Sequence, residues 1–507
     1  MINKTLLSLL LPVFACGLLA GAPDRSSTKG VRTLRSFGAV GDGRTDDRAA
    51  IADALNRAQG EPVDGEGLTY SVRGNIEVKT NVDFRHATLI QTMGPPDTRR
   101  FLQESGQLTV APADALLKEN VKGLPVMRAD GLGTYSGTKP PTAEEFSQLM
   151  SGIALRTLDI RGSEGKPVAV RLSKIRIDRG RHPNSGGRTD GAGIQLSYAS
   201  PVQVRDTVIT GDGKGTGLML SNCAKVRIER IHIHDMTWAP YDGDEIFSKI
   251  SAKEVRDDFG WNVFPIYEVR TAMKRFVRVR VQEQLVGIFV GQCNDVEIVD
   301  SRIERLQTKI GDRLYPLQSD AITIGNTKGV VVRNTDMAKA WEGIDFTGKS
   351  GQDFLFENCT VTDTIGWAFK LAHDKKNGKI IDCTAIRGGI AGFLVGAQSE
   401  NVELIRCRAI ETAGNRYWDA SDGRRLMAMS GFRIQGIEGL ATPRKIKLED
   451  CLAINQLHAG AIDYGILCEA VGPEREITLG KFTTSGAKIQ DIKVGPREDQ
   501  VAKAASR

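Results

Sequence analysis

Three acidic residues, a lysine and a histidine near the middle of the chain are the side chains best suited to chemistry. They are Asp320, Glu342, Asp345, Lys370 and His373. Carboxyl groups held close together push their pKa values apart, so that one keeps its proton while another is ionised near neutral pH. Such a pair suits general acid and general base work on a glycosidic bond. Because these residues are far apart in number, a repeating fold must bring them together.

A second reaction fits the same residues. A polysaccharide lyase removes the proton next to a uronate carboxyl group, which requires a cation to neutralise that carboxylate and a base. Lys370 and His373 are the candidate bases, and the three acidic side chains offer the hard oxygen ligands that Ca²⁺ binds. A structural alternative stays open, in which Asp345 and Lys370 form an ion pair between coils and His373 is only a turn residue.

An internal repeat in the sequence predicts a fold that can bring these residues together. Four segments align without a gap on an apolar residue, here called position zero, and are apolar again at positions +8, +10 and +15. Position zero is occupied by Ile194, Leu218, Ile288 and Ile322, and then, with small insertions, by Ile344, Phe369, Phe393, Phe432 and Ile462. Apolar residues two apart indicate short strands with alternate side chains inward. Three such strands in a unit of about two dozen residues predict an all-β solenoid, the right-handed parallel β-helix.

The repeat places the chemical residues in vertical files. Asp320 and Glu342 occupy position −2 of consecutive units, and Asp345 and Lys370 occupy position +1 of consecutive units. Successive strands lie about 4.8 Å apart, so these side chains are expected to meet. Arg433 continues the outward file at position +1.

Aromatic and acidic residues of the second insertion, at about 236–275, are expected to bind sugar, because rings stack on pyranose faces and carboxylates accept hydrogen bonds from hydroxyl groups. The alternative, that this insertion is a packed side loop, stays open. The expected substrate-binding residues are Arg433, Trp238, Tyr241 and Trp341.

Two further files consist of small residues. Position −1 is Gly or Ala in all nine units, which allows tight packing and would also make the floor of a groove. Cys223 and Cys293 share position +5 with Thr327. Four other cysteines precede the last strand of their units, where Ser301 and Thr335 stand elsewhere: Cys359, Cys383, Cys407 and Cys451. Since Ser and Thr substitute for Cys, we expect a ladder of small buried residues and no metal or redox site.

The segment 37–51 precedes the repeat. Asp42-Gly43 is a turn pair, and Thr45 or Asp46 can cap a helix that runs to about Ala58. This segment closely resembles the N-terminal motif of the pectate-lyase-like superfamily, which includes rhamnogalacturonase-type, epimerase-like and phage depolymerase proteins. The resemblance implies a β-helix whose first end this helix closes. It does not imply one reaction, because that family contains lyases, hydrolases and epimerases.

Polygalacturonases, which share that fold, are similar in placing carboxylates just before the position-zero strand of consecutive coils. Their double-Asp, Gly-His-Gly and Arg-Ile-Lys signatures are not present here in the family's order. The segment 431–435 echoes only the last, with Gln435 where that family has Lys.

The expected organisation has a signal, a cap, a coil and two insertions. We expect a signal peptide at 1–22, the N-terminal cap and first coils at 23–94, an insertion at 95–150, the β-helix at 151–495 with a second insertion at about 236–275, and a tail at 496–507.

The signal has a positive start at Lys4, an apolar run too short to span a membrane, and a small-residue cleavage site before Pro23. The protein is therefore expected to be secreted or periplasmic, with a lipid anchor through Cys16 as the alternative. No later segment is expected to span a membrane.

Charge and cysteine usage narrow the partners. The net charge of +6 favours an acidic polymer such as a polyuronate, whereas the scattered basic residues argue against nucleic acid. The seven cysteines outside the signal are an odd number, which argues against a full disulfide framework.

We therefore expect an enzyme acting on an acidic polysaccharide, foremost a lyase, with Ca²⁺ as the one conceivable cofactor. The alternatives are a glycoside hydrolase of the polygalacturonase or rhamnogalacturonase type, a C5-epimerase, or a noncatalytic polysaccharide-binding or surface β-helix. Clustered carboxylates favour an enzyme, because close like charges destabilise a fold.

Overall fold

The computed structural model describes most of the chain between residues 32 and 495. The described residues are 32–92, 120–121, 124–125, 155–181, 191–212, 215–238, 245–257, 260–270, 276–280, 285–310, 313–315, 319–413, 429–436, 440–459, 461–469 and 476–495. The expected signal peptide, the tail and most of the 95–150 segment lie outside them. No helix among these residues is long and apolar enough to cross a membrane.

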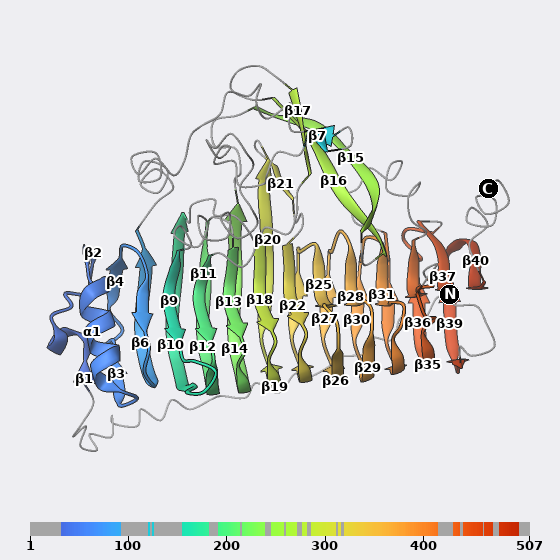
Figure 1. Cartoon of the computed structure of the whole chain (residues 1–507). Coiled ribbons are helices and arrows are strands. Elements are labelled where there is room, and N and C mark those ends of the chain that lie inside the picture. Colours follow the sequence, from blue (N-terminus) through green and yellow to red (C-terminus); the bar gives the residue numbers. More distant parts are fainter. Residues whose placement is uncertain are drawn as a thin grey trace, which may run out of the picture.

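Coils stacked along one axis build the molecule (Figure 1). Each complete coil has three short strands, as in β25 (Glu342–Thr347), β26 (Gly351–Glu357) and β27 (Thr360–Thr362). Each strand pairs in parallel with its counterpart in the next coil, for example Asp345 with Lys370. The three-stranded unit and the parallel β-helix expected from the sequence are confirmed.

One sheet of twelve strands carries the position-zero residues, and we call it sheet B. Its strands, in spatial order, are β5 (Ile76–Val78), β9 (Arg156–Arg161), β11 (Ala192–Ser197), β13 (Gly215–Ser221), β18 (Leu285–Gly291), β22 (Ser319–Gly325), β25, β28 (Trp367–Leu371), β31 (Ala391–Val395), β34 (Ser430–Ile434), β37 (Ile462–Cys468) and β40 (Ala487–Val494).

The other two sides of the coil form one continuous sheet, sheet A, because the long strands near its N-terminal end pair with both stacks. Its strands are β1 (Arg32–Thr33), β2 (Asp42–Asp46), β3 (Pro62–Asp64), β4 (Thr69–Val72), β6 (Val82–Gln91), β10 (Val168–Arg181), β12 (Ala199–Asp212), β14 (Ala224–Trp238), β19 (Asn294–Val299), β20 (Arg302–Ile310), β21 (Arg313–Tyr315), β23 (Lys328–Arg333), β24 (Asp336–Ala338), β26, β27, β29 (Lys375–Ile381), β30 (Thr384–Ile386), β32 (Glu400–Ile405), β33 (Arg408–Ile410), β35 (Arg444–Glu449), β36 (Cys451–Ile454), β38 (Ile477–Leu479) and β39 (Phe482–Ser485).

The interior is a column of apolar side chains. Position-zero residues are buried throughout, and three phenylalanines stack along the axis. The rings of Phe369 and Phe393 are parallel with centroids 4.8 Å apart, as are those of Phe393 and Phe432. The column replaces the single core of a compact domain, since each coil buries its apolar face against its neighbours.

A helix closes the first end of the coil. It is α1 (Arg48–Ala58), and it buries Ile51, Ala54, Leu55 and Ala58. A short 3₁₀ turn, η1 (Leu34–Phe37), precedes it. The N-cap residue is Asp47, not Thr45 or Asp46 as expected, but its carboxylate does not cap the helix, because it accepts hydrogen bonds from the backbone N–H groups of Val40 and Gly41 at 2.6 and 3.1 Å. The Asp46 carboxylate accepts from the N–H of Arg48, the first residue of the helix, at 3.2 Å.

Each corner of the coil is a residue in the left-handed backbone region. One corner file has φ between 49° and 54° in ten successive coils, at His86, Lys174, Asp206, Arg230, Asp300, Asn334, Asn358, Asp382, Arg406 and Asp450. Asn and Asp tolerate this region because their side chains hydrogen-bond locally. Their side chains also pair between coils: Arg406 binds Asp382 with two hydrogen bonds, of 2.7 and 2.6 Å. These side-chain contacts link the corners of adjacent coils.

The files of small residues lie inside the packed structure. A Cβ added to Gly287 would approach the carbonyl oxygen of Ala321 on the next coil to 2.4 Å, so this file allows close strand approach and does not floor an open groove. The cysteines form the expected ladder. All seven described ones are free and buried, and the Cys359 and Cys407 thiols donate to backbone carbonyls.

In the last of the nine expected units, the residue at position zero differs from the expected one. Phe432 pairs with Ile466, so Ile466 and not Ile462 occupies position zero. Gly465 therefore takes the small position before it, instead of Ala461. A short segment here offers two candidate pairs of a small and an apolar residue, and periodicity alone selected the wrong one.

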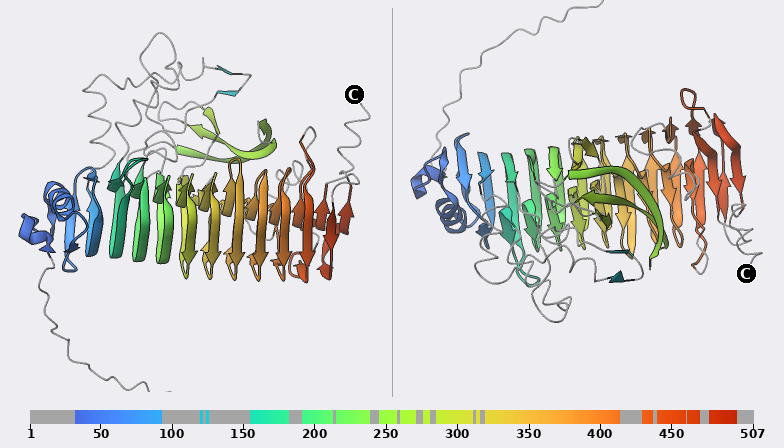
Figure 2. Two further views of the ribbon diagram at one scale, coloured as in Figure 1. Left: turned by 60° about the horizontal axis from the view of Figure 1, so that its bottom comes forward. Right: turned by 90° about the horizontal axis from the view of Figure 1, so that it is seen from above.

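An antiparallel sheet departs from the coil between β14 and β18. It consists of β15 (Glu245–Asp257), β16 (Gly260–Arg270) and β17 (Phe276–Arg280), and Figures 1 and 2 show it above the yellow and orange coils. A two-stranded ribbon, β7 (Asn120–Val121) with β8 (Leu124–Pro125), also lies apart from the coil.

Candidate functional site

The outward file of sheet B carries the candidate site. Position +1 runs through consecutive strands as Thr323, Asp345, Lys370, Leu394 and Arg433. The residues before the strands line up too, with Asp320 opposite Glu342. The two expected files are therefore present, and they bring four of the five expected catalytic residues into one group on β22, β25 and β28.

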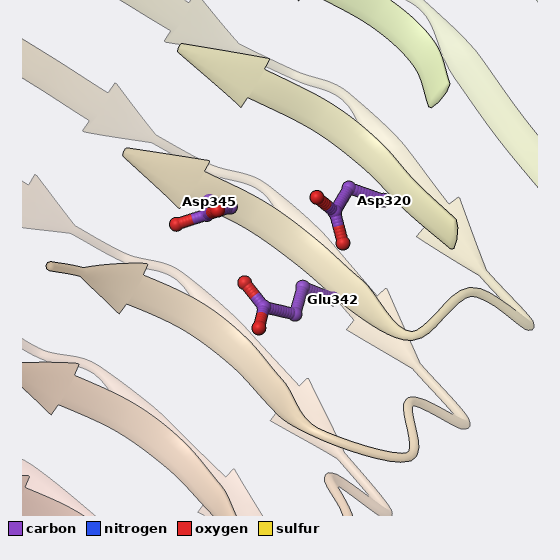
Figure 3. Close-up of side chains that lie close together, drawn as sticks. All are labelled: Asp320, Glu342 and Asp345. Carbon is purple, nitrogen blue, oxygen red and sulfur yellow. The ribbon is translucent and has the colours of Figure 1, made fainter. Parts of the chain in front are cut away.

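Three carboxylates converge on the same face of the sheet (Figure 3). One oxygen from each of Asp320, Glu342 and Asp345 lies within 4.8 Å of the others. All three residues are buried, with 1%, 3% and 1% of their surface exposed. Thr323 donates a hydrogen bond of 3.0 Å from its hydroxyl to Asp320 Oδ2. We call these three acids and Lys370 the acidic cluster.

Lys370 is the cation of the acidic cluster. Its Nζ lies 3.0 Å from Glu342 Oε1 and 3.4 Å from Asp345 Oδ1. Burial alone would lower the pKa of this lysine, but the surrounding carboxylates outweigh it and raise that pKa above its usual value. Lys370 is therefore a fixed ammonium group. Its side chain is 15% exposed, more than either carboxylate partner, so the cluster reaches solvent past this lysine.

Glu342 is the group that keeps a proton. Burial raises its pKa well above the usual value, and Asp345 and Asp320 add to this, while Lys370 opposes it. Glu342 Oε1 accepts from Lys370, whereas Oε2 is buried with no hydrogen-bond partner in the described part of the chain. Asp345 Oδ1 pairs with the Lys370 ammonium at 3.4 Å, and Asp320 Oδ2 accepts the Thr323 hydroxyl.

An apolar group borders the acidic cluster. Trp367, Ile390, Ala391 and Leu394 pack together apart from the main core, and Lys370 Nζ lies 5.1 Å from the centroid of the Trp367 ring. Sequence reasoning missed Trp367, although it occupies the same position before its strand as Asp320 and Glu342, and counting along the file would have found it.

The donor set of the acidic cluster determines which metal ion it could bind. Three hard carboxylate ligands suit Ca²⁺, which takes about six to eight oxygens. However, the Lys370 ammonium contacts two of these three residues. A divalent cation would have to displace that lysine, so these residues fit the ion poorly in the present arrangement.

The other expected site residues lie elsewhere. His373 lies in the turn after β28, and its carbonyl oxygen accepts a 2.6 Å hydrogen bond from Lys375 Nζ. Arg433 is in the outward file but is buried, and Glu469 binds its guanidinium with two hydrogen bonds of 3.1 and 3.0 Å. Trp341 was wrongly expected to bind sugar, because it is 2% exposed and packs in the main core.

The remaining two aromatic candidates are not placed by the structure. Trp238 ends β14, but its side chain lies outside the described residues, as does Tyr241.

Comparison with known families identifies the class. A family model described as a right-handed β-helix region matches residues 269–422, which include the acidic cluster. A second, described as the N-terminal extension of bacteriophage endosialidase, matches residues 39–85, the capped end of the coil. The protein is a right-handed parallel β-helix protein. This is the fold that the resemblance of the segment 37–51 implied.

Solved structures share the fold at low sequence identity. The surface adhesin PfbA of Streptococcus pneumoniae is 11% identical with a TM-score of 0.48, and 90% of each chain is covered. Endo-xylogalacturonan hydrolase from Aspergillus tubingensis is 13% identical with a TM-score of 0.44, covering 92% of this chain and 97% of that one. The A-module of the Azotobacter vinelandii mannuronan C-5 epimerase AlgE4 is 10% identical with a TM-score of 0.35, covering 92% and 98%. No curated protein matches significantly.

Proposed function

We propose that the protein is a carbohydrate-active enzyme that hydrolyses a glycosidic bond in a polysaccharide. The observation that carries this proposal is the unequal pair of carboxyl groups in the acidic cluster. Burial and the neighbouring carboxylates raise the pKa of Glu342, which favours its protonated form, while Asp345 pairs with Lys370 and Asp320 accepts from Thr323. Most glycosidases use such a pair of carboxyl groups, one protonated and one ionised.

Each residue has a part in the reaction. Glu342 donates its carboxyl proton to the leaving-group oxygen as the bond breaks. Asp345 supplies the second carboxylate, as nucleophile or base on the sugar ring. Lys370 holds both groups in place, since its ammonium contacts each of them. Asp320 adds a further negative charge beside the reacting carbon.

The charge of the acidic cluster suits hydrolysis better than elimination. With Glu342 protonated, two carboxylates and one ammonium leave the cluster negative. Glycoside hydrolysis passes through an oxocarbenium-like, positively charged transition state, which a negative site stabilises. Elimination next to a uronate carboxyl group builds negative charge instead, which the same site would oppose. Lys370 is also a poor base, because its pKa is raised.

A lyase stays as the second candidate because the three carboxylate oxygens converge as a possible Ca²⁺ ligand set.

Product analysis separates the candidates. The protein is incubated with polyuronates and with neutral polysaccharides, each with added Ca²⁺ or with a chelator. Reducing ends that appear without new ultraviolet absorbance, and that survive chelation, support hydrolysis. Ca²⁺-dependent absorbance from new double bonds would replace hydrolysis with elimination. Binding without any product on all substrates would contradict catalysis and favour a noncatalytic binding protein.

A further inference from the structure

A trough on sheet A, far from the acidic cluster, has the shape and charge of a second binding site. It is a cavity of about 330 Å³ near the capped end of the coil, and its lining residues come from β6, β10, β12 and the turn before β4. These strands are neighbours in the stack (Figure 1). The volume falls within the range of small-ligand sites.

The register shows that the trough runs along the coil axis. One wall is the corner file His86, Lys174 and Asp206, and the other is the file Thr88, Arg176 and Val208, two residues further along each strand. Between the walls lie Ala87 and Ile175, which are 3% and 1% exposed because their side chains pack into the core of the coil. A channel across successive strands accepts an extended chain, whereas a pocket within one coil would not.

The trough is basic. Lys174 and Arg176 are exposed on its two walls. The single carboxylate on its lining, Asp206, is neutralised by Arg230, whose Nε and Nη2 lie 2.7 and 3.3 Å from its two oxygens. His86, which also lines the trough, binds Asp64 through Nδ1 at 3.0 Å. The net charge of the residues that line the trough is therefore positive.

We propose that this trough binds the acidic groups of a carboxylated polysaccharide and holds the polymer on the coil outside the catalytic cluster. Lys174 and Arg176, on the two walls of the trough, suit the carboxylates of such a chain. The inference rests on the proposed function for its choice of ligand. It also explains how a negative cluster could act on an acidic polymer, because the polymer's charge is recognised elsewhere.

The test measures binding and not turnover, so that it stands apart from catalysis. The full-length protein carrying Glu342→Gln is titrated by calorimetry with an oligogalacturonate and with a neutral galactan oligomer of matched length. We expect the oligogalacturonate to bind, with affinity falling as salt rises, and the neutral oligomer to bind far more weakly. Equal binding of the two oligomers would overturn the proposal.

Charge-reversal variants then locate the site. Lys174→Glu together with Arg176→Glu should weaken oligogalacturonate binding about tenfold or more. Arg408→Glu is the matched control, because Arg408 is exposed and occupies the same file of sheet A as Arg176, but in a distant coil. Unchanged affinity in the double variant, or an equal loss in the control, would overturn the assignment. If the trough binds as expected while no substrate is cleaved, the catalytic proposal alone fails.

Discussion

Lys370 and Glu342 make a buried contact of 3.0 Å between strands of adjacent coils. The neighbouring carboxylates raise the pKa of Lys370 against the effect of burial, whereas burial and the other two carboxylates raise the pKa of Glu342. Twenty-eight residues of sequence separate the two, and only the coil register brings them together. The chemistry of the site follows from this contact and from the two aspartates around it.

Removing the Lys370 charge should destabilise the fold most at neutral pH. The raised pKa of Lys370 means that its stabilising contribution is fully present below the usual value of 10.5 and is lost only above the higher folded value. At neutral pH, Lys370→Met leaves buried carboxylates uncompensated, at a cost of about 3–5 kcal/mol. At acid pH the carboxyl groups take up protons, so the cost should shrink. Urea unfolding at both pH values measures it.

Lys379→Met is the control, because Lys379 forms an exposed ion pair with Glu403. Such pairs contribute about 1 kcal/mol or less. A Lys370 variant as stable as this control at neutral pH would show that the acidic cluster is not charged as described.

A second lysine should give the stability curve a slope on the alkaline side. Lys375 is fully buried, and desolvation lowers its pKa to about 8 from 10.5, despite the opposing charges of Asp345 and Asp374. Between those pH values the unfolded chain binds the proton and the folded one does not, so stability rises with pH. The rise is on the order of 3 kcal/mol. This rise should disappear in the Lys375→Met variant. The same dependence of stability on pH in the variant and in the native protein would contradict the lowered pKa of Lys375.

The sequence explains how a lysine fits there. Lys375 occupies the interior file that holds Cys293 and Thr327 in other coils, and its neighbour in the file is Gly351. A Cβ at Gly351 would lie 2.7 Å from Lys375 Cδ, so the missing side chain makes the space. Nζ then donates to the carbonyl oxygens of Gly348 and His373, both at 2.6 Å.

The separation of the carboxylates predicts the stereochemistry of hydrolysis. Oxygens of Glu342 and Asp345 lie within 4.8 Å. Retaining glycosidases have carboxyl groups about 5–5.5 Å apart, and inverting enzymes about 6.5–9.5 Å to admit a water molecule. We therefore expect retention of the anomeric configuration. Proton NMR of the first-formed product distinguishes the two, and an inverted product would contradict the assignment of Asp345 as nucleophile.

The cysteine ladder should tolerate serine and reject larger residues. At the same file position Ser301 donates to the carbonyl oxygen of Val299 at 2.7 Å, so a hydroxyl finds an acceptor there. Cys383→Ser should therefore cost about 1 kcal/mol or less in unfolding free energy. Cys383→Leu should cost about 1–3 kcal/mol by overpacking. Equal costs, measured by urea unfolding, would contradict a tightly packed ladder.

Sequence periodicity predicted the coil and the meeting of the four cluster residues, because position-zero residues recur wherever a strand must bury one face. It did not predict the burial of the acidic cluster or of Arg433, because the outward face of a strand carries no signal for what covers it. Trp341 shows the same limit: its neighbour Glu342 lies in the outer file, while Trp341 packs in the main core.

The residues at the corners of the coil could not be predicted from the sequence, for a different reason. Residues such as Asp206 and Arg230 are ordinary charged residues in the sequence, and only their shared left-handed backbone places them in one file. Pairing across coils then gives each its partner. Counting positions outward from each strand would show that these charged residues share one file, whereas hydrophobic periodicity does not.

The most direct test of the account is the rate of glycosidic cleavage by Glu342→Gln, measured as reducing ends on the best polysaccharide substrate. Glutamine keeps the size of the side chain but has no proton to donate, so kcat should fall by about 100- to 10,000-fold. The variant should unfold at a urea concentration no lower than the native protein, because a strained buried acid is removed. A Glu342→Gln protein that retains the native kcat would contradict Glu342 as the proton donor and, with it, the acidic cluster as the catalytic site.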